Sequence, residues 1–399
     1  MTPENFMMIN SFRLWSCAIL LLASACEVPG EDPVGPRGQY VYVWVGDAES
    51  PTGDYLAVLD IDSLSPSYGT IVANVSTGRS GGAHHVEHVM PEGDRLMVNA
   101  FRAGESFVMN LSDPRTPRIE TSFTNAGPYT FPHSFERTPS GNVLATFQNQ
   151  GENHGTPGGL VELDLLGNMI RGSDAADPID PDLRPYSLAI LPEDDLVVTT
   201  TADMQRSGLT PQSFQVWRLS DLALLHTVLL PPGPRGDENI DVAEARVLED
   251  GKTVIVTTFR CGMYRVEGLG TKKPSARFIH AFPWGSYEKD AACALPVVMG
   301  RFWVQTVAPT HSLVVFDMSD PDRPIQVSEL QLGDADLPHW ISGEVGGDRI
   351  VLTGQGTLSH KVLLLHLNRD TGALTLTAEL TPAWPTGDPM PHGAVFSRP

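Results

Sequence analysis

The sequence predicts an all-β protein, a seven-bladed β-propeller in which N- and C-terminal strands close one blade together. Two observations support this class. The 399 residues include 37 glycines and 33 prolines, a composition typical of many short strands joined by turns. A unit of roughly 40 to 50 residues also recurs along the chain, and four strands per unit of that length are the signature of a propeller blade.

Each recurring unit opens with a short apolar strand, passes a Pro, Gly or Asp turn, and continues into a second β-rich strand. Five clear copies, a shorter sixth copy and a last copy reduced to its first strand give seven openings. Six or eight blades are the alternatives. The openings are residues 85–98, 133–147, 186–200, 243–257, 292–305, 339–352 and 391–396.

The last opening lacks outer strands, whereas three strand candidates near the N-terminus lack partners. These candidates are residues 40–45, 55–60 and 70–75. Joining both ends of the chain in one blade would pair edge strands that are otherwise exposed, so we expect the termini to close the ring. No linker divides the chain further on, and residues 39–399 are expected to form a single propeller domain.

The N-terminus resembles a bacterial export signal. Residues 14–25 are apolar, follow Arg13 and end in small residues before Cys26, and this stretch is too short to span a bilayer. We expect residues 1–25 to be a lipoprotein-type signal peptide, Cys26 to carry a lipid anchor and residues 26–38 to be a flexible tether. Ordinary cleavage without lipidation is the alternative. In both cases the protein is expected outside the cytoplasm, in the periplasm or anchored to the outer membrane.

Charge and cysteine content narrow the possible functions. The formal net charge of −21 is spread over many turns and would repel phosphate backbones, so no nucleic-acid partner is expected. In an oxidising compartment Cys261 and Cys293 could form a disulfide, and two separately buried thiols are the alternative. The sequence has no nucleophile elbow, phosphate loop, HExxH or paired CxxC motif, which leaves redox or binding chemistry.

Histidines open several of the repeat units. Because the first strand of every propeller blade lines the central channel, residues at matching openings should lie on one ring around the axis. Imidazoles that converge in this way suit a transition metal such as copper. The alternative is a set of polar side chains in a water-filled channel. The main candidates are His85, His133, His339 and His392, with His84 and His88 in the same strands or turns.

Three acidic residues lie near the same openings. Glu136, Glu244 and Asp290 would face the channel and act as metal ligands, tune a ligand histidine or transfer protons. Solvated acids at the channel rim are the alternative. Other histidines, among them His226 and His360, fall in ordinary strand or loop contexts and are expected to be structural.

A series of motifs resembles the selenium-binding protein and methanethiol oxidase family. Residues 54–62 (DYLAVLDID), residues 65–69 (SPSYG) and the His84-His85 pair are similar to the family's DYLAVVDVD-type strand, SPxYG-type turn and HH pair. The resemblance continues in the same order and spans about residues 40–396. Its later matches are Pro132-His133, residues 155–163, Val216-Trp217, Glu244, Cys261, Asp290, His311, residues 317–324 and His392.

This resemblance implies a seven-bladed propeller and, as in the bacterial methanethiol oxidases, a copper-dependent oxidation of methanethiol with oxygen to formaldehyde, hydrogen sulfide and hydrogen peroxide. It also adds His311 to the candidate metal ligands. The chain departs from the family where residues 86–90 (VEHVM) replace a cysteine-rich segment associated with selenium, so selenium binding is not predicted. Glu136 replaces a family histidine and His339 a position that is usually Gln, so we expect a rearranged ligand set.

The favoured function is therefore a metal-dependent oxidoreductase that oxidises a small thiol with oxygen, with copper or another transition metal as cofactor. A non-catalytic lipoprotein that binds a protein or small-molecule partner through its propeller loops is the alternative from a different class. A lactonase-type hydrolase ranks last because it would need a carboxylate-rich calcium site, whereas this chain offers mostly imidazoles.

Overall fold

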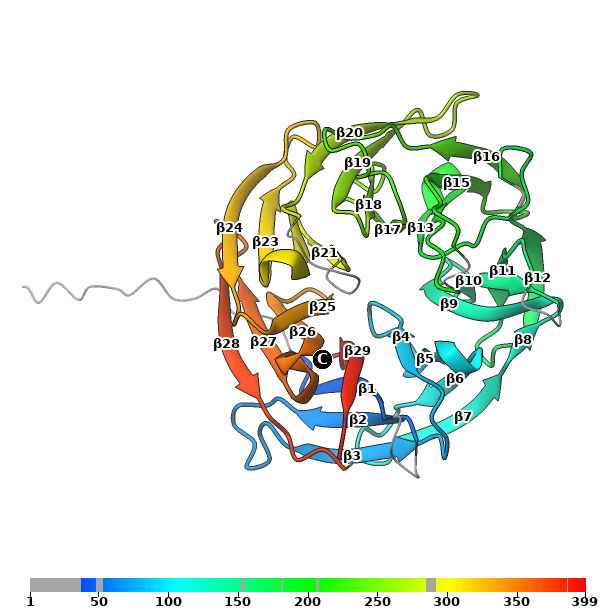
Figure 1. The fold of residues 1–399 in the computed structure, drawn as a ribbon. Coiled ribbons are helices and arrows are strands. Elements are labelled where there is room, and N and C mark those ends of the chain that lie inside the picture. The colour runs from blue at the N-terminus through cyan, green and yellow to red at the C-terminus, as the bar shows by residue number, and fades with distance from the viewer. Residues whose placement is uncertain are drawn as a thin grey trace, which may run out of the picture. The chain divides into compact units, whose positions relative to one another are not determined.

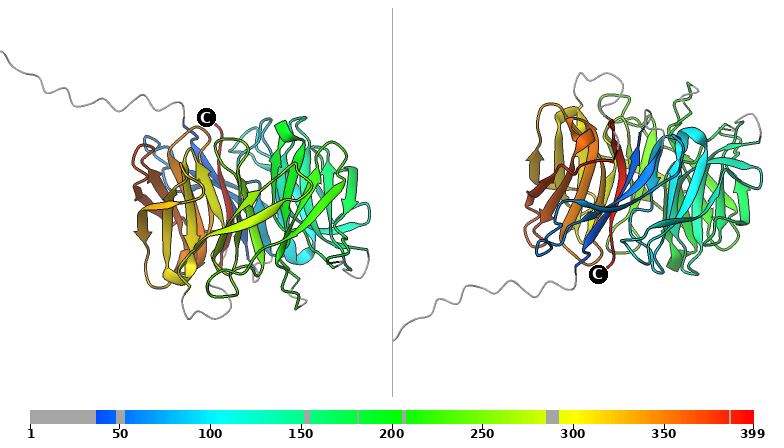
Figure 2. Two further views of the ribbon diagram at one scale, coloured as in Figure 1. Left: turned by 90° about the horizontal axis from the view of Figure 1, so that it is seen from above. Right: turned by 90° about the horizontal axis from the view of Figure 1, so that it is seen from below.

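The computed structural model describes residues 37–47, 53–151, 155–180, 182–205, 208–284, 292–385 and 387–399. These residues belong to one compact unit within residues 35–399. Their strands form seven antiparallel sheets arranged as a ring around a central axis (Figure 1), which confirms the predicted seven-bladed propeller. In the side views the sheets stand next to one another around this ring (Figure 2).

One blade combines the two ends of the propeller unit, as predicted. Its strands, from the channel outward, are β29 (Met390–Phe396), β1 (Tyr40–Gly46), β2 (Tyr55–Asp60) and β3 (Ile71–Ser76). Val43 lies between Ala57 on one side and Ala394 on the other. Strand β1, in blue, therefore lies next to β29, in red (Figure 1), and neither β1 nor β2 remains as a free edge.

The other blades are built from consecutive strands, and the first long strand of each lies innermost. The first two such blades contain β4 (Ala83–Val86), β5 (Arg95–Ala100), β6 (Glu105–Asn110) and β7 (Arg118–Phe123), then β8 (Asn125–Ala126), β9 (Tyr129–Arg137), β10 (Val143–Gln150), β11 (Gly159–Leu163) and β12 (Met169–Asp174). The next two contain β13 (Leu188–Leu191), β14 (Leu196–Thr200), β15 (Ser213–Arg218) and β16 (Leu224–Leu229), then β17 (Val242–Val247), β18 (Val254–Thr258), β19 (Gly262–Glu267) and β20 (Ser275–Ala281).

The remaining blades follow the same plan. They contain β21 (Pro296–Met299), β22 (Phe302–Val307), β23 (Ser312–Asp317) and β24 (Ile325–Gln331), then β25 (Asp336–Gly343), β26 (Arg349–Gly356), β27 (Val362–Leu367) and β28 (Leu374–Leu380). Short 3-10 turns lie at η1 (Phe101–Ala103), η2 (Pro192–Asp194), η3 (Ala308–Thr310) and η4 (Thr357–His360). No helix in these described segments is long and apolar enough to cross a membrane.

The burial pattern explains why the strands form. Strand β2 is rich in apolar residues and is buried along its whole length, because it packs between two neighbouring sheets. The outermost strand β7 instead alternates exposed and half-buried residues, as expected for a strand with one face in water. Four tryptophans with no significant exposure fill spaces between blades: Trp44, Trp217, Trp303 and Trp340.

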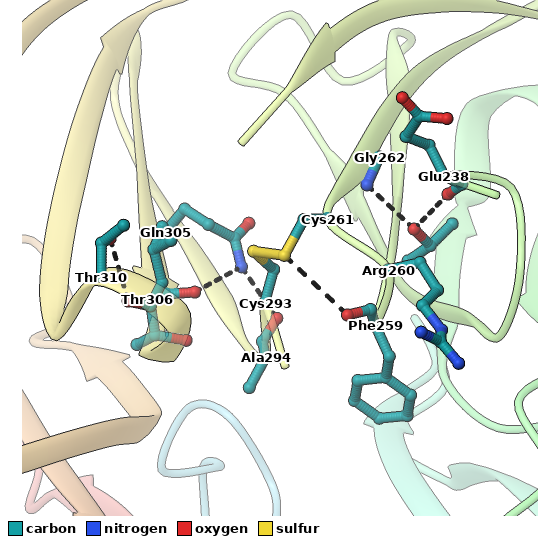
Figure 3. Close-up of a disulfide and its surroundings, with 12 residues drawn as sticks. Glu238, Phe259, Arg260, Cys261, Gly262, Cys293, Ala294, Gln305, Thr306 and Thr310 are labelled. Carbon is teal, nitrogen blue, oxygen red and sulfur yellow. Dashed lines mark hydrogen bonds between the residues drawn. A yellow bond between two sulfur atoms is a disulfide. The ribbon is translucent and has the colours of Figure 1, made fainter. Parts of the chain in front are cut away.

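The structure settles one alternative that the sequence left open, because Cys261 and Cys293 form a disulfide. Cys261 lies between β18 and β19, and Cys293 precedes β21 of the next blade, so the bond joins two neighbouring blades (Figure 3). Both cysteines are fully buried. The Gln305 side-chain amide donates a hydrogen bond to the carbonyl of Ala294 and fixes the same segment.

Candidate metal centre

Five histidines from four inner strands meet in the central channel. They lie in β4, β9, β25 and β29, which are neighbouring inner strands around the axis. Their rings contact one another in a continuous chain. The distances between ring centroids are 4.3 Å for His84–His85, 4.2 Å for His85–His133, 4.4 Å for His84–His392 and 4.5 Å for His339–His392. We call these five residues the histidine cluster.

Hydrogen bonds between blades hold the backbone of the cluster in place. The Asn99 side chain accepts a hydrogen bond from the backbone N–H of His85 at 2.7 Å and donates to the carbonyl of His133 at 2.9 Å. Asn99 is fully buried, so it fixes β4 against β9 without competition from water. On the other side of β4, the Thr353 hydroxyl donates to the carbonyl of His392.

Each member of the cluster has one buried ring nitrogen without a hydrogen-bond partner in the described residues. Buried nitrogen atoms that lack a partner are uncommon in native proteins and indicate an additional ligand or a catalytic role. The five imidazoles are therefore prepared to bind a group that the protein itself does not supply. The atoms are His84 Nδ1, His85 Nε2, His133 Nε2, His339 Nε2 and His392 Nδ1.

The neighbours of His133 set its protonation state. Its Nδ1–H donates to the Tyr186 carbonyl at 2.9 Å, so the partnerless Nε2 carries a lone pair directed away from this bond. Ser134 Oγ lies 3.1 Å from His133 Nδ1 and 3.2 Å from His85 Nδ1. The Ser134 hydroxyl therefore restrains both rings through the nitrogen that would not bind a metal.

Three of the imidazoles fit a transition metal. One nitrogen each from His84, His85 and His133 lies within 4.8 Å of the others. Burial lowers the pKa of His133 to about 3 and, together with neighbouring imidazoles, the pKa of His84 and His85 well below the usual 6.5. The rings are thus neutral at pH 7 and can donate lone pairs, a donor set that suits copper, zinc, iron or nickel.

A second layer of polar side chains lies about three residues further along the inner strands than the histidine cluster. The Arg246 guanidinium donates to Glu244 Oε2 at 2.6 Å through Nη1, and its Nη2 lies 3.0 Å from His88 Nε2. Ser187 Oγ also donates to Glu244, at 2.7 Å. His88 stacks on Trp340 and contacts the His85 ring at 6.2 Å, so this layer touches the histidine cluster.

An open cavity of about 870 Å³ reaches this second layer from the channel mouth where the inner strands end. His88, Ser134, Glu136 and Arg246 lie at its lining. Burial raises the pKa of the Glu136 carboxyl to about 7, and the Arg246 charge opposes that shift only in part. Glu136 can therefore exchange a proton with a cavity ligand near neutral pH.

The structure places the other predicted site residues as follows. Glu244 is fully buried and is held by Arg246 and Ser187, while its Oε1 has no partner in the described part of the chain. His311 follows η3, where its Nδ1 lies 2.9 Å from the carbonyl of Asp336. Asp290 and Cys26 lie outside the described residues.

Sequence reasoning missed two site residues that occupy matching repeat positions. Tyr186 stands where other units have His85 or His133, and its ring lies 3.9 Å from His133 between centroids. Arg246 follows Ala243 by three residues, as Glu136 follows His133 and His88 follows His85. Aligning every unit at both positions, instead of searching for histidines alone, would have identified them.

Comparisons with known proteins agree with the motif pattern. A methanethiol oxidase of Hyphomicrobium sp. is 26% identical over 347 residues, which cover 79% of this chain and 75% of that protein. The chain is a distant relative of the selenium-binding protein and methanethiol oxidase family. A second member of this family, a methanethiol oxidase of Ruegeria pomeroyi, is 27% identical over 154 residues, or 36% of this chain and 34% of that protein. No family model matches the chain.

Solved structures show the same fold at low sequence identity. A hypothetical selenium-binding protein from Sulfolobus tokodaii gives a TM-score of 0.75 with 16% identity, over 91% of this chain and 94% of that one. A periplasmic gluconolactonase from Pseudomonas aeruginosa gives a TM-score of 0.65 with 14% identity, over 90% of this chain and 99% of that one. Propellers of different names share this architecture, so function has to be argued from the site.

Proposed function

We propose that this protein is a methanethiol-oxidase-like oxidoreductase that converts a small thiol, oxygen and water into an aldehyde, hydrogen sulfide and hydrogen peroxide. The proposal depends mainly on the histidine cluster, in which each imidazole has one buried nitrogen without a partner in the described residues, next to an open cavity. The two methanethiol oxidases among its relatives support this reaction class. The reaction balances, because the thiol carbon loses two electrons and its C–S bond while oxygen gains two electrons.

His84, His85 and His133 would hold the metal, with copper as the first candidate, and His392 and His339 are the nearest additional donors. A bound copper ion would supply a binding site for thiolate sulfur and a path for its electrons to oxygen. The protein's own residues orient the donors and exclude bulk water. Tyr186 and Trp340 are buried against the His85 ring, at 5.8 and 5.1 Å between centroids.

Around this centre the second layer would handle the substrate and its protons. A thiol entering the cavity meets His88, Arg246 and Glu136 before it reaches the histidine cluster. The Arg246 guanidinium, which is paired with Glu244, would donate a hydrogen bond to the thiolate and so favour it over the thiol, and Glu136 would accept the released proton. Tight hydrogen bonds to Glu244 and His88 keep the guanidinium in one position.

We also propose that the propeller acts outside the cytoplasm, where Cys26 would attach it to a membrane by a lipid. The proposal rests on the apolar segment and small residues that precede Cys26. Its partners would then be a small thiol and the membrane surface, without nucleic acid. Mass spectrometry of the N-terminus from a native bacterial host would show a lipidated Cys26, or an unmodified end if ordinary cleavage occurs.

Metal analysis tests the proposed centre directly. The protein lacking residues 1–26 should retain about one copper ion per chain after reconstitution and dialysis, because three convergent neutral imidazoles form a strong nitrogen site. A His85→Asn/His133→Asn double variant should lose this copper. The matched control is His226→Asn/His360→Asn, which changes two histidines outside the cluster and should retain the copper. The measurement is inductively coupled plasma mass spectrometry, with circular dichroism to verify folding.

Equal copper retention by the cluster variant and its control would contradict the metal centre. The alternative function, a non-catalytic propeller that binds a partner through its loops, would then account better for the buried polar channel. If copper binds as expected, methanethiol-dependent release of sulfide and peroxide is the activity to measure, with both products expected in a 1:1 ratio.

The pH profile tests the role of Glu136. Because burial raises its pKa to about 7, the carboxyl is protonated below that pH and becomes a proton acceptor above it. We expect kcat/KM for methanethiol to rise through about pH 7 and then level off. A Glu136→Gln variant should lose this rise and be slower by about 10²-fold. Glu92→Gln, at the cavity mouth but highly exposed, is the control and should keep the profile.

A further inference from the structure

The cavity is much larger than methanethiol, which has only two heavy atoms. Its volume of about 870 Å³ lies within the range of roughly 300–1,000 Å³ that proteins use for ligands of drug size. A two-atom substrate would leave most of this space to water. The size of the cavity therefore calls for a ligand with a longer body.

The lining combines a polar floor, an apolar wall and further charged residues, among them Arg137, Glu344 and Arg369. The floor contains His88, Ser134, Glu136 and Arg246, the residues of the channel nearest to the histidine cluster. The wall consists largely of apolar side chains from the ends of β13, β17 and β21. Its main members are Leu188, Ile190, Val247, Val297, Val298 and Met299.

The floor is held rigidly and carries a fixed cation. Arg246 Nη1 donates to Glu244, which leaves Nη2, 3.0 Å from His88 Nε2, as its outer donor. His88 is in turn stacked on Trp340, with ring centroids 4.7 Å apart, and its carbonyl accepts a hydrogen bond from Ser342 Oγ at 2.6 Å. The preorganised guanidinium is paired with Glu244, but its N–H groups can still donate hydrogen bonds to a sulfur atom that carries negative charge.

We propose that the cavity binds alkyl thiols with a chain of several carbons, with the sulfur at the floor near His88 and Arg246 and the chain along the apolar wall. This inference rests on the proposed function and specifies its substrate class. The overall conversion stays balanced: a primary thiol, oxygen and water give the aldehyde of the same chain length, hydrogen sulfide and hydrogen peroxide. The wall residues then determine specificity without touching the reacting atoms.

Chain length should show in the Michaelis constant. Each methylene group that moves from water to an apolar wall improves binding about fourfold. From methanethiol to butanethiol, three added methylene groups should therefore lower KM by about 60-fold, with a smaller change in kcat. The copper-loaded protein is assayed for sulfide release with the methane-, ethane-, butane- and hexanethiol series.

A matched pair of variants tests whether the wall is responsible. Val297 is half-buried on β21 and lines the cavity. Val297→Trp should therefore fill part of the cavity and raise the KM for butanethiol at least tenfold. The ratio of kcat/KM for butanethiol to that for methanethiol should therefore fall at least tenfold. Val327→Trp makes the same change on the outermost strand β24, where the residue is exposed, and should alter neither substrate.

Binding of hexyl methyl sulfide, a thioether without a thiol hydrogen, provides a readout that does not need catalysis. Titration calorimetry should show binding that Val297→Trp weakens at least tenfold and Val327→Trp leaves unchanged. If methanethiol is oxidised but KM does not fall with chain length, the substrate-class proposal is wrong while the proposed function stands. If no thiol is oxidised, the proposed function fails, and thioether binding with this variant pattern still supports the cavity assignment. Absence of thioether binding overturns it.

Discussion

Acidification from pH 7.5 to 5.5 should strongly destabilise the metal-free protein, because its channel holds six imidazoles in their neutral form. Burial lowers the pKa of each to values below the usual 6.5, to about 4 for His339 and about 3 for His133. In the unfolded chain these groups titrate near pH 6.5. The full set is His84, His85, His88, His133, His339 and His392.

The direction of the effect follows from proton linkage. Below pH 6.5 the unfolded chain binds protons that the folded protein cannot bind, so their contribution to stability is complete above pH 6.5 and is lost as the pH falls. Each such imidazole changes the free energy of unfolding by at most about 1.4 kcal/mol per pH unit. Glu136 and Asp241, with pKa values raised to about 7 and about 6, oppose this loss because they bind protons more readily when folded.

The net loss should be about 4 kcal/mol between pH 6.5 and 5.5, a large fraction of the 5–15 kcal/mol that typically stabilises a domain. Urea unfolding in the presence of a chelator, at pH 7.5, 6.5 and 5.5, measures it. A His84→Asn/His392→Asn variant should flatten the dependence by up to about 3 kcal/mol per pH unit, whereas His226→Asn/His360→Asn should not. A free energy of unfolding that stays constant within about 1 kcal/mol over this range would contradict the buried neutral cluster.

Most of the fold could be predicted because it depends on local pattern and chain order. Short apolar strands and turn residues recur at a regular spacing, and the final unit, residues 391–396, lacks outer strands that the N-terminus can supply. Edge pairing then leaves one simple way to close the ring. The convergence of His85, His133, His339 and His392 follows from the same repeat, since equivalent inner-strand positions face one axis.

The side-chain arrangement could not be predicted to the same degree. Position in the repeat does not specify ring orientation, and His88 turns toward Trp340 and Arg246, whereas His84 stacks on His85. Equivalent positions of the repeat can carry different residue types. A search for histidines alone therefore missed Tyr186. These choices depend on packing between blades that are distant in sequence.

The disulfide illustrates a third kind of limit. Cys261 and Cys293 are separated by 32 residues, and that spacing is compatible with a bond or with two isolated thiols. The distance between the two cysteines in the folded chain decides between these alternatives, and it depends on the path of the chain before β21. In the structure the two Cα atoms lie 5.0 Å apart, within the range that a disulfide requires.

Removal of the C-terminal strand should abolish the cooperative fold, which would be the largest effect of any single change to the propeller. Strand β29 is the innermost strand of the closing blade, and Ala394, Val395 and Phe396 in it are buried. Burial of each large apolar side chain contributes about 1.5–3 kcal/mol. Without β29, strand β1 becomes an unpaired edge facing the channel, and the Trp340 indole N–H loses its acceptor, the carbonyl of Ala394.

A variant lacking residues 390–399 should therefore be insoluble or show no sigmoidal thermal transition, whereas removal of residues 398–399 alone should shift the melting temperature by only a few degrees. A synthetic peptide of residues 388–399 added during refolding should restore the transition, because it can pair with β1 in the native register. This rescue separates loss of the closing strand from general damage to the chain. A truncated protein that melts cooperatively near the parent temperature would mean that the ring is held by packing between the other blades, and that His392 is dispensable for the fold.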